Sequence, residues 1–426
     1  MSVIAPLLAP ACLREGVRAE GPPQPIWQAR LDRMSRLPGA GVSFARPSAA
    51  PAWNHDGLLA DVAADVPVFM HNAAGCNRGL ACLEARTNSL LHSRDLTQPA
   101  WSQIDITVLR DAVGLDGAPG TACTLIDSST GSQGIVLQSV GIGDDTAGHV
   151  ATLHVAKDDD TSRYAFLQFD LIGGSIVREQ LWLDTANGTL TPAVSQGSHR
   201  IEDAGAWWRI EMAVTNNASG NTAARLRLRP AAGTVIGVVT DNAVGSIVID
   251  GAQVLTGTTR AAGAPIATGA VPVTRAADSA TVDLAGRLPG AFGFEAMWDA
   301  DGGEPEYARV LEFNDGTADN LIALIRAGDQ VQCNVVNAGG FVVNANIGAW
   351  TAGSHRVVAR IAQDRFAVAM DGAAPVSDGS GAVPAVDRLL LGHATGASWL
   401  DSALASVAVW PWAPSDDALQ ALSARR

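Results

Sequence analysis

The sequence predicts an all-β protein with two β-sandwiches that follow an extended N-terminal arm. Strand-like segments recur about every ten residues from Leu83 to Leu255, and a second series runs from Phe292 to Trp412, as in antiparallel sandwiches. Many segments alternate apolar and polar residues, which is typical of strands with one buried face. Turns rich in Asn, Asp and Gly separate them, and the first series contains no segment with helical periodicity.

The length, charge and hydropathy limit the classes of function. At 426 residues the chain is long enough for two or three domains. Its formal net charge of −14 disfavours nucleic acid and anionic lipid surfaces as partners. The single lysine, Lys157, lies in a predicted turn beside three aspartates, which argues against Schiff-base chemistry. No segment reaches the 18 or so apolar residues that a membrane span needs, so membrane insertion is not expected.

The cysteines indicate neither a disulfide framework nor a zinc site. The five cysteines are sparse and lack C-x-x-C spacing: Cys12, Cys76, Cys82, Cys123 and Cys333. This pattern predicts folding in a reducing cytoplasm with unpaired thiols, although Cys76 and Cys82 are near enough in sequence to pair across a loop. No second Cys or His pair lies at zinc-ligand spacing.

Residues 1–80 are predicted to be an attachment arm with short strands. The segment is rich in Pro and apolar residues, and its one predicted helix runs from Ile26 to Leu37. Its N-terminus lacks the basic residues and the uninterrupted apolar run of a signal peptide. Because its apolar pieces have no partner within the arm, we expect residues 1–40 to be needed for assembly on a larger particle and not for folding.

Residues 81–258 are predicted to form the first sandwich. In the run 178–184, Leu181 and Leu183 are assigned to the core, so Trp182 faces outward beside Gln180 and Asp184. The same alternation predicts the inward and outward residues of two further strands: Leu167, Phe169, Trp208, Ile210, Met212 and Val214 inward, with Gln168, Asp170 and Trp207 outward. Asn187-Gly188 is predicted to be a hairpin turn.

Residues 259–285 are predicted to be an extended interdomain segment, because they are rich in Thr, Gly, Ala and Pro. Residues 286–426 are predicted to form the second sandwich, which ends in a short helix capped by Ser415. Four side chains are predicted to share one core face of its successive strands: Leu311, Phe313, Ile325 and Val358.

Four runs of the chain resemble phage-type structural and adhesion proteins. They are SFARPSAAPAWNHDGLLADVAADVPVF (43–69), LEARTNSLLHSRDLTQPAW (83–101), IVIDGAQV (247–254) and PIATGAVPVTRAADSATV (265–282). The resemblance implies a component of a virion or of a gene transfer agent, such as a head spike, a head fibre or a tail-associated adhesin. A protein of this kind is made in the bacterial cytoplasm and is displayed on the particle surface.

The strand series of the second block resembles the concanavalin A-like, laminin-G-type sandwich. Its closing run RLLLGHATGASWLDSALASVAVWPWAPSDDALQAL (388–422) has the pattern of a strand that ends at Gly, a loop, a final strand that ends in Trp410 and a terminal helix. This resemblance implies a jelly-roll fold, which by itself fixes no function.

Two kinds of ligand site are hypothesised, and no catalytic residue is identified. Trp182, Gln180 and Asp184, together with Trp207, combine aromatic rings with polar groups as a glycan site does, unless the rings are covered by the 259–285 segment, the arm or another subunit. In the acidic loop 298–307, Asp299, Asp301 and Glu304 form either a calcium site or a solvated turn. No other cofactor is expected.

The sequence therefore predicts a non-enzymatic surface protein that attaches to particle head or tail proteins by its N-terminal arm. Its ligand would be host cell-surface polysaccharide, and the protein is expected to be a homo-oligomer. Two alternatives remain: a capsule-degrading glycoside hydrolase or lyase on the same particle, and a purely structural decoration protein. No nucleophile elbow, P-loop, Rossmann or HExxH motif is present, and no carboxylate pair stands out for glycoside hydrolysis.

Overall fold

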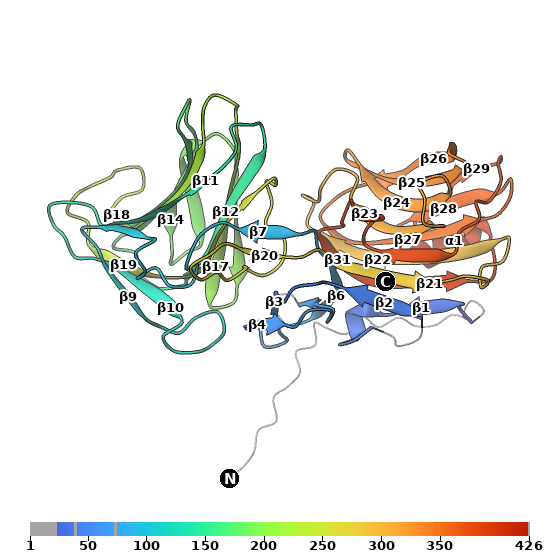
Figure 1. Ribbon diagram of the computed structural model, residues 1–426, viewed down its shortest axis with the longest axis horizontal. Coiled ribbons are helices and arrows are strands. Elements are labelled where there is room, and N and C mark those ends of the chain that lie inside the picture. The colour runs from blue at the N-terminus through green and yellow to red at the C-terminus, as the bar shows by residue number, and fades with distance from the viewer. Residues whose placement is uncertain (1–23, 38–40, 72–74, 425–426) are drawn as a thin grey trace, which may run out of the picture. The chain divides into compact units, whose positions relative to one another are not determined.

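The protein is described by a computed structural model that covers residues 24–37, 41–71 and 75–424. The regular structure of these residues consists of β-strands, apart from one α-helix, α1 (Asp416–Ser423), and one short 3-10 helix, η2 (Leu31–Arg33) (Figure 1). The predicted all-β class is therefore confirmed. The chain divides into two compact units. Unit 1 contains Met1–Ser43, Cys76–Cys82 and Ser279–Arg426, and unit 2 contains Phe44–Gly75 and Leu83–Asp278. In the described part of the chain no helix is long and apolar enough to cross a membrane.

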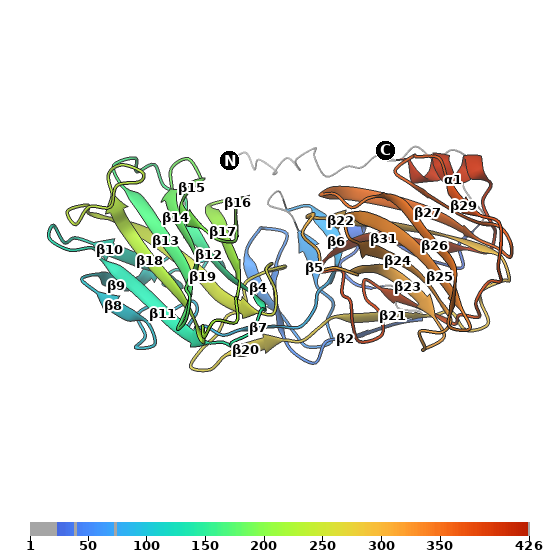
Figure 2. The ribbon, with the colours of Figure 1, turned by 90° about the horizontal axis from the view of Figure 1, so that it is seen from above.

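Unit 2 contains a sandwich of two antiparallel sheets, as Figure 2 shows. The first sheet has the order β16-β17-β12-β19-β10-β9, with β9 (Thr107–Ala112), β10 (Ala122–Asp127), β12 (Gly148–Ala156), β16 (Ser198–Ala204), β17 (Trp207–Thr215) and β19 (Gly245–Thr256). The second has the order β15-β14-β13-β18-β11-β8, with β8 (Ser102–Ile104), β11 (Ile135–Gly141), β13 (Tyr164–Ile172), β14 (Val177–Asp184), β15 (Thr189–Ser195) and β18 (Ala223–Gly233). Short strands complete the unit: β3 (Ala50–Trp53), β4 (Leu59–Val62), β5 (Phe69–His71), β7 (Arg86–Asn88) and β20 (Val273–Arg275).

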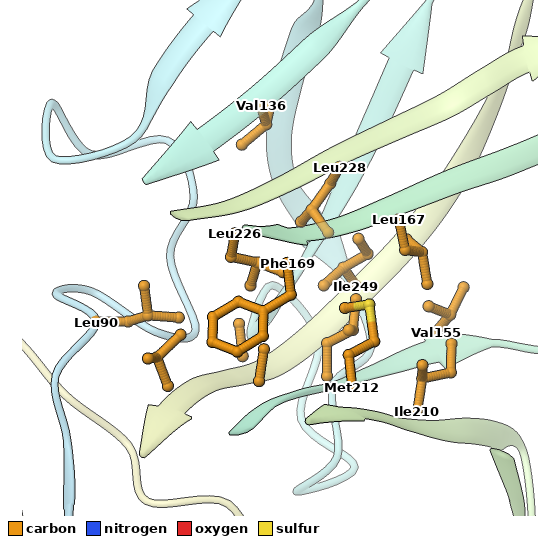
Figure 3. Packing of buried hydrophobic residues seen from close by; sticks show 14 of the residues in the cluster. Leu90, Val136, Val155, Leu167, Phe169, Ile210, Met212, Leu226, Leu228 and Ile249 are labelled. Carbon is orange, nitrogen blue, oxygen red and sulfur yellow. The ribbon is translucent and has the colours of Figure 1, made fainter. Parts of the chain in front are cut away.

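The core of unit 2 lies between its two sheets. Leu167 and Phe169 from β13 face Ile210 and Met212 from β17, and all four are fully buried (Figure 3). Val214 is also in this core and Trp208 packs at its margin, so the predicted inward faces of β13, β14 and β17 are confirmed. The period-two alternation of apolar residues is therefore sufficient to assign which side chains of these three strands face the core.

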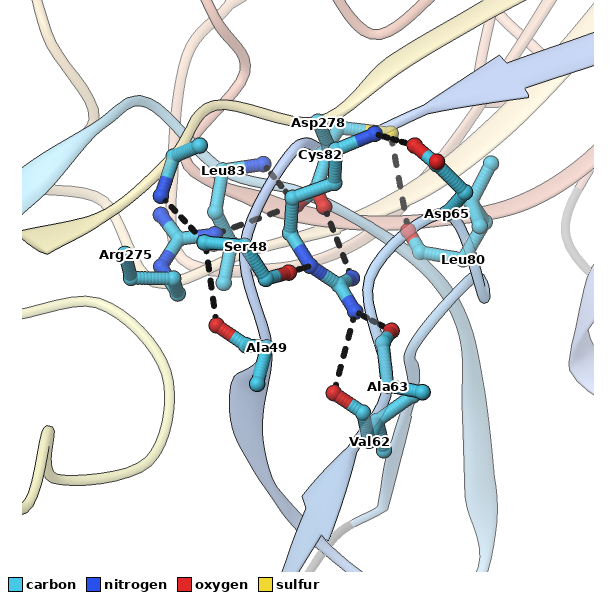
Figure 4. Close-up of polar contacts among 12 residues, drawn as sticks. Ser48, Ala49, Val62, Ala63, Asp65, Leu80, Cys82, Leu83, Arg275 and Asp278 are labelled. Atoms are coloured by element: carbon cyan, nitrogen blue, oxygen red, sulfur yellow. Dashed lines mark hydrogen bonds and ion pairs between the residues drawn. The ribbon is translucent and has the colours of Figure 1, made fainter.

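Three of the runs that resemble phage-type proteins meet at a buried ion cluster in unit 2. The Arg46 guanidinium donates to Asp278 at 3.2 Å and to the backbone carbonyl of Ala63 at 2.8 Å (Figure 4). Asp278 also accepts from Arg275 at 3.2 Å and from the amide of Leu83 at 3.0 Å. Because both arginines and the carboxylate are nine-tenths or more buried, the cluster joins distant segments of the chain in a defined register.

The remaining run, 247–254, is held in unit 2 by its residue Asp250. Arg94 donates to both carboxylate oxygens of Asp250, at 2.8 and 2.6 Å, and to Asp116 at 2.9 Å. Buried Asn88 supports the same region, because its side chain bonds the carbonyls of Ala252 and Ile266 and the amides of Leu90 and Val254. The polar residues of the resembling runs thus have structural partners inside unit 2.

Unit 1 is the second sandwich. Its first sheet has the order β29-β28-β27-β22-β31-β6, with β6 (Asn77–Cys82), β22 (Phe292–Ala300), β27 (Gly353–Ile361), β28 (Phe366–Met370), β29 (Val376–Asp378) and β31 (Ser402–Trp410); β1 (Trp27–Ala29) also pairs with β31. The other has the order β2-β21-β30-β23-β24-β25-β26, with β2 (Val42–Ala45), β21 (Ser279–Asp283), β23 (Arg309–Asn314), β24 (Leu321–Ala327), β25 (Gln330–Asn337), β26 (Gly340–Ala349) and β30 (Arg388–Leu391).

The structure differs from the predicted domain boundaries in the described part of residues 1–80. This segment is not a separate arm, because β1 and β6 pair with β31 of unit 1 whereas residues 44–75 belong to unit 2. The helix predicted from Ile26 to Leu37 is wrong: the chain forms β1 and η2 instead. The edge of β31 offers backbone hydrogen bonds and burial of Trp27 and Leu31, which outweigh weak local helical periodicity.

The predicted interdomain segment 259–285 is also divided. Ala261 and Ile266 pack on the outer face of the β12–β17–β19 region with Val150, Ala213 and Leu255, so this part belongs to unit 2. Residues from Ser279 onward enter unit 1 as β21.

The four residues predicted to form the core of the second sandwich are all buried, but two of them lie on the outer faces of their sheets. Leu311, Phe313, Ile325 and Val358 are all buried. Phe313 lies inside the sandwich, with its ring 5.2 Å from that of Phe294. Ile325 packs on the outer face of its sheet, and Val358 packs on the other outer face, under α1 with Trp410 and Leu419. In β24 and β27 consecutive residues are buried on both faces, so sequence alternation does not show which of them face the core.

Two local predictions are confirmed. Ser415 caps α1, because its side chain accepts a hydrogen bond from the Ala418 amide at 3.3 Å. Asn187-Gly188 lies in the turn between β14 and β15, where Gly188 has a φ of +64° that favours glycine.

The cysteine prediction is partly wrong. Cys76 is disulfide-bonded, whereas Cys123 and Cys333 are buried free thiols. Cys82 is buried and is not part of a disulfide. The proposed alternative of a Cys76–Cys82 pair is therefore excluded. Cys12 lies outside the described residues.

Candidate functional site

The two tryptophans predicted to bind glycan are not free rings on the surface. Trp182 faces away from the core as predicted, but it is only 2% exposed. It packs edge-on against Phe166, with ring centroids 4.9 Å apart, and against Ala232 and Ile236. The loop that follows β18 therefore covers the ring, and sequence alternation could not reveal this cover. A sugar cannot stack on Trp182 in this structure.

Trp207 is half-buried by segments distant in sequence. It packs in a small cluster with Trp53, Leu59, Leu115 and Ala264. Ala264 comes from the 259–285 segment and Leu59 from the N-terminal part of the chain, so the alternative in which these segments cover the ring is the one observed for Trp207.

The two polar partners of Trp182 have different roles. Asp184 is 8% exposed, and its carboxylate accepts hydrogen bonds from the amides of Ala186 and Asn187 and from the Asn187 side chain at 2.9 Å. This carboxylate stabilises the β14–β15 turn. Gln180 is half-buried at the centre of the outer face of β14 and remains a candidate for ligand contact.

The carboxylates of the acidic loop have partners within the protein. Asp299 and Asp301 pair with Arg78 at 3.3 and 3.4 Å. Buried Glu304 accepts from the amides of Asp301 and Gly302 and from the Trp350 indole at 2.8 Å. Over the described ranges, no three His, Cys, Asp or Glu side chains are placed to hold a metal ion. The calcium hypothesis for Asp299, Asp301 and Glu304 is therefore not supported.

The outer face of the β15-β14-β13-β18-β11-β8 sheet has an unusual concentration of arginine. Strand pairing aligns its side chains in rows across β14, β13 and β18: Arg178, Asp170 and Arg225; Gln180, Gln168 and Arg227; Trp182, Phe166 and Arg229. Strand β11 extends the first row with Ser139 and the second with Leu137. We call these residues the arginine face.

Hydrogen bonds order the side chains of the arginine face. Arg225 donates to Asp170 at 2.9 Å, and Arg178 lies 3.9 Å from the other oxygen of the same carboxylate. Arg229 donates to Gln133 at 2.8 Å and lies over the Phe166 ring, 5.5 Å from its centroid. These contacts hold the guanidinium groups in place and so reduce the conformational entropy lost when a ligand binds.

The cationic groups of the face are crowded. Burial, followed by the charge of Arg225, lowers the pKa of Arg227, and burial, followed by the charge of Arg227, lowers the pKa of Arg229. Both groups stay protonated, because an arginine pKa starts so far above neutral pH. The downward direction reflects burial and the repulsion between neighbouring guanidinium groups.

The sequence analysis missed these arginines, although the signal is visible. The run ARLRLRP (224–230) alternates arginine with leucine, which places three cations on one strand face. The registers of β18 beside β13 and of β13 beside β14 are tertiary facts, and they place Arg227 in one row with Gln168 and Gln180.

Comparisons with known proteins give structural similarity only. No family model and no curated protein matches the chain. Similar solved structures include domains LG4-5 of the mouse laminin alpha1 chain, with 13% identity, a TM-score of 0.21 and coverage of 77% of this chain and 88% of that chain. Another is the N-terminal CBM22-1-CBM22-2 tandem domain of Paenibacillus barcinonensis Xyn10C, with 9% identity, a TM-score of 0.25 and coverage of 78% and 98%. At these TM-scores the similarity assigns neither a ligand nor a reaction to this chain.

Proposed function

We propose that this chain is a non-enzymatic protein that binds polysaccharide on the arginine face of unit 2. The observation that carries the proposal is the alignment of amide and guanidinium groups across three adjacent strands, with Gln180, Gln168 and Arg227 in one row. Amide and guanidinium groups together offer the donors and acceptors that sugar hydroxyls need. Placement on sheet strands keeps the groups rigid, which favours binding.

The arginine face does not favour hydrolysis. Glycoside hydrolases of the common type need two carboxyl groups about 5 to 10 Å apart beside the scissile bond. On this face the Asp170 carboxylate is 1% exposed and pairs with Arg225, and Asp184 is engaged in its turn. Neither carboxylate is placed to protonate a leaving group, so binding without cleavage is the function that these residues support.

We also propose that the protein is displayed on a phage or gene-transfer-agent particle, where it meets host cell-surface polysaccharide. The support is the resemblance of the four runs in residues 43–282 to phage-type structural and adhesion proteins. The first 23 residues, which lie outside the described part of the chain, are the proposed particle attachment. Negative-stain images of particles labelled with an antibody to unit 2 test this placement.

Binding and cleavage can be tested together with the full-length chain. Affinity electrophoresis would use alginate, hyaluronan, xanthan and gellan as acidic polysaccharides, with dextran, levan and curdlan as neutral ones, and each mixture would also be assayed for released reducing ends. We expect retention by at least one polysaccharide without release. Release of reducing ends would replace the proposal with the enzyme alternative, and absence of retention in every gel would favour the decoration protein.

A further inference from the structure

We infer that the polysaccharide bound by the arginine face is anionic, and that Arg227 makes the central contact with its carboxylate, sulfate or phosphate groups. The inference rests on the proposed function and specifies its ligand class.

The charge balance of the face is opposite to that of the whole chain. Four guanidinium groups, those of Arg178, Arg225, Arg227 and Arg229, share the face with only two carboxylates. These are Asp170 and Asp184, and the Asp184 carboxylate is engaged in its own turn. The full chain carries a formal net charge of −14. A cationic cluster on an acidic protein requires a local reason, because like charges held together destabilise the fold. An anionic ligand would neutralise the excess charge.

Of the three arginines on β18, Arg227 has the weakest hydrogen bonding. Its one hydrogen bond recorded among the described residues runs from Nη1 to Gln168 at 3.4 Å, which is near the limit for such a bond. The Nε atoms of Arg225, Arg227 and Arg229 are all buried without a partner, so the three residues differ at their terminal nitrogens. Arg225 is committed to Asp170 and Arg229 to Gln133. The terminal nitrogens of Arg227 are the least committed of the three and can donate two hydrogen bonds to an oxyanion.

The arginine face is open to a long ligand. On one side of the rows, Ser139 of β11 is exposed; on the other, Thr191 and Val194 of β15 are exposed. Alternate residues of a strand lie about 7 Å apart, so the cations on β18 form a line instead of a single point. A polymer with repeated anionic groups can place more than one of them along this line, and each added contact raises the affinity.

The observations favour an acidic polysaccharide over a nucleic acid. The aromatic residues of the face, Trp182 and Phe166, are 2% and 5% exposed, so bases have no ring on which to stack. The negative charge of the rest of the chain also disfavours a long, densely charged backbone such as duplex DNA. A polysaccharide with one charge per several sugars meets less of this repulsion.

The test uses the full-length chain with matched variants. Arg227→Gln removes the charge while keeping side-chain length and polarity, and Arg227→Lys keeps the charge but removes the planar fork. Arg110→Gln is the control, because Arg110 lies on β9 of the other sheet with a side chain 40% exposed. Circular dichroism and thermal melts establish that every variant is folded. Affinities are measured for the acidic polysaccharides that the wild-type protein retains.

The expected result is a loss of affinity of about tenfold or more for Arg227→Gln, because each charge-assisted hydrogen bond contributes on this scale. Arg227→Lys should fall between Arg227→Gln and wild type, and Arg110→Gln should bind as the wild type does. Binding should weaken steeply with added salt. Carboxyl reduction, desulfation or dephosphorylation of the retained polysaccharide should abolish binding, and the treatment that succeeds identifies the anionic group.

Each contrary outcome has a distinct meaning. Equal retention of a polysaccharide before and after its charge is removed, or an Arg227→Gln variant that binds as the wild type does, overturns this inference and leaves polysaccharide binding standing. Absence of retention by every polysaccharide overturns the proposed function itself. Tighter binding to a DNA oligonucleotide than to any polysaccharide, with the same loss in Arg227→Gln, assigns the face to nucleic acid.

Discussion

His154 on β12 is a buried histidine that the fold keeps neutral. It is 1% exposed, neither ring nitrogen has a hydrogen-bond partner, and the Trp53 ring lies edge-on at 5.5 Å. Burial, with a smaller contribution from the charge of Arg209, lowers the pKa of His154 to about 3. Nearby His149 on the same strand also has a pKa lowered by burial. The folded protein therefore resists protonation of both side chains.

This burial predicts a loss of stability in mild acid. Below the ordinary histidine pKa of 6.5 the unfolded chain takes up protons that the folded chain refuses, so the free energy of unfolding falls as pH drops from 6.5 toward 3. Denaturant titrations between pH 7 and pH 4.5 measure the fall before most carboxylates titrate. His154→Phe should flatten this pH dependence while keeping the aromatic contact with Trp53. An unchanged slope in that variant would show that other groups cause the acid sensitivity.

Phe313 is the residue on which the core of unit 1 depends most clearly. It is fully buried and lies 5.6 Å from the Phe292 ring and 5.2 Å from the Phe294 ring. Phe313→Ala should lower the free energy of unfolding by about 3 to 5 kcal/mol, because it removes buried area and leaves a cavity. Phe341→Ala is the matched control, since Phe341 is 66% exposed and its loss should change stability by about 0.5 kcal/mol at most. Similar effects of the two changes would contradict the packing described here.

At the scale of elements, the segment β1–η2 decides whether the N-terminal part is dispensable. Trp27, Gln28 and Ala29 pair with β31, and Leu31 is fully buried. Removal of residues 1–40 is therefore expected to damage unit 1, which reverses the expectation from sequence that this segment serves assembly alone. The reason is that a short strand contributes little by itself but completes the edge of an existing sheet.

Leu31→Ala tests this structural role without truncation. We expect the change to lower the free energy of unfolding by about 2 to 5 kcal/mol, as measured by denaturant titration. Leu109→Ala provides the comparison, because Leu109 is 43% exposed on β9. If both variants were as stable as the wild type, β1–η2 would not be an integral part of the sandwich.

At the scale of the whole molecule, the two units contain separate cores, and only unit 2 carries the arginine face. Hydrogen exchange with a retained acidic polysaccharide should therefore slow exchange in β13, β14 and β18 and leave β23, β24 and β25 of unit 1 unchanged. A ligand that contacts side chains on rigid strands suppresses local opening of those strands. Protection confined to unit 1 would move the binding site to the second sandwich.

The sequence by itself determined the fold class and most strand faces. Alternation placed Leu181 and Leu183 inward and Trp182 outward, because side chains of a strand must point to opposite sides whatever its neighbours are. Local chemistry likewise placed the Ser415 cap and the Gly188 turn, since each depends on atoms only a few residues away. The arginine run on β18 was also present in the sequence, and its alternation was open to the same reasoning.

Only the tertiary structure decided what lies over each outward face and which strands are neighbours. Trp182 is outward and yet buried because the loop after β18 folds over it, and Val358 is outward and yet buried because α1 covers it. The pairing of β1 with β31 joins residues almost four hundred positions apart. Such contacts depend on non-local burial and on register, which a one-dimensional pattern does not encode. For the same physical reason, the sequence alone does not show that Gln180, Gln168 and Arg227 lie in one row across three strands.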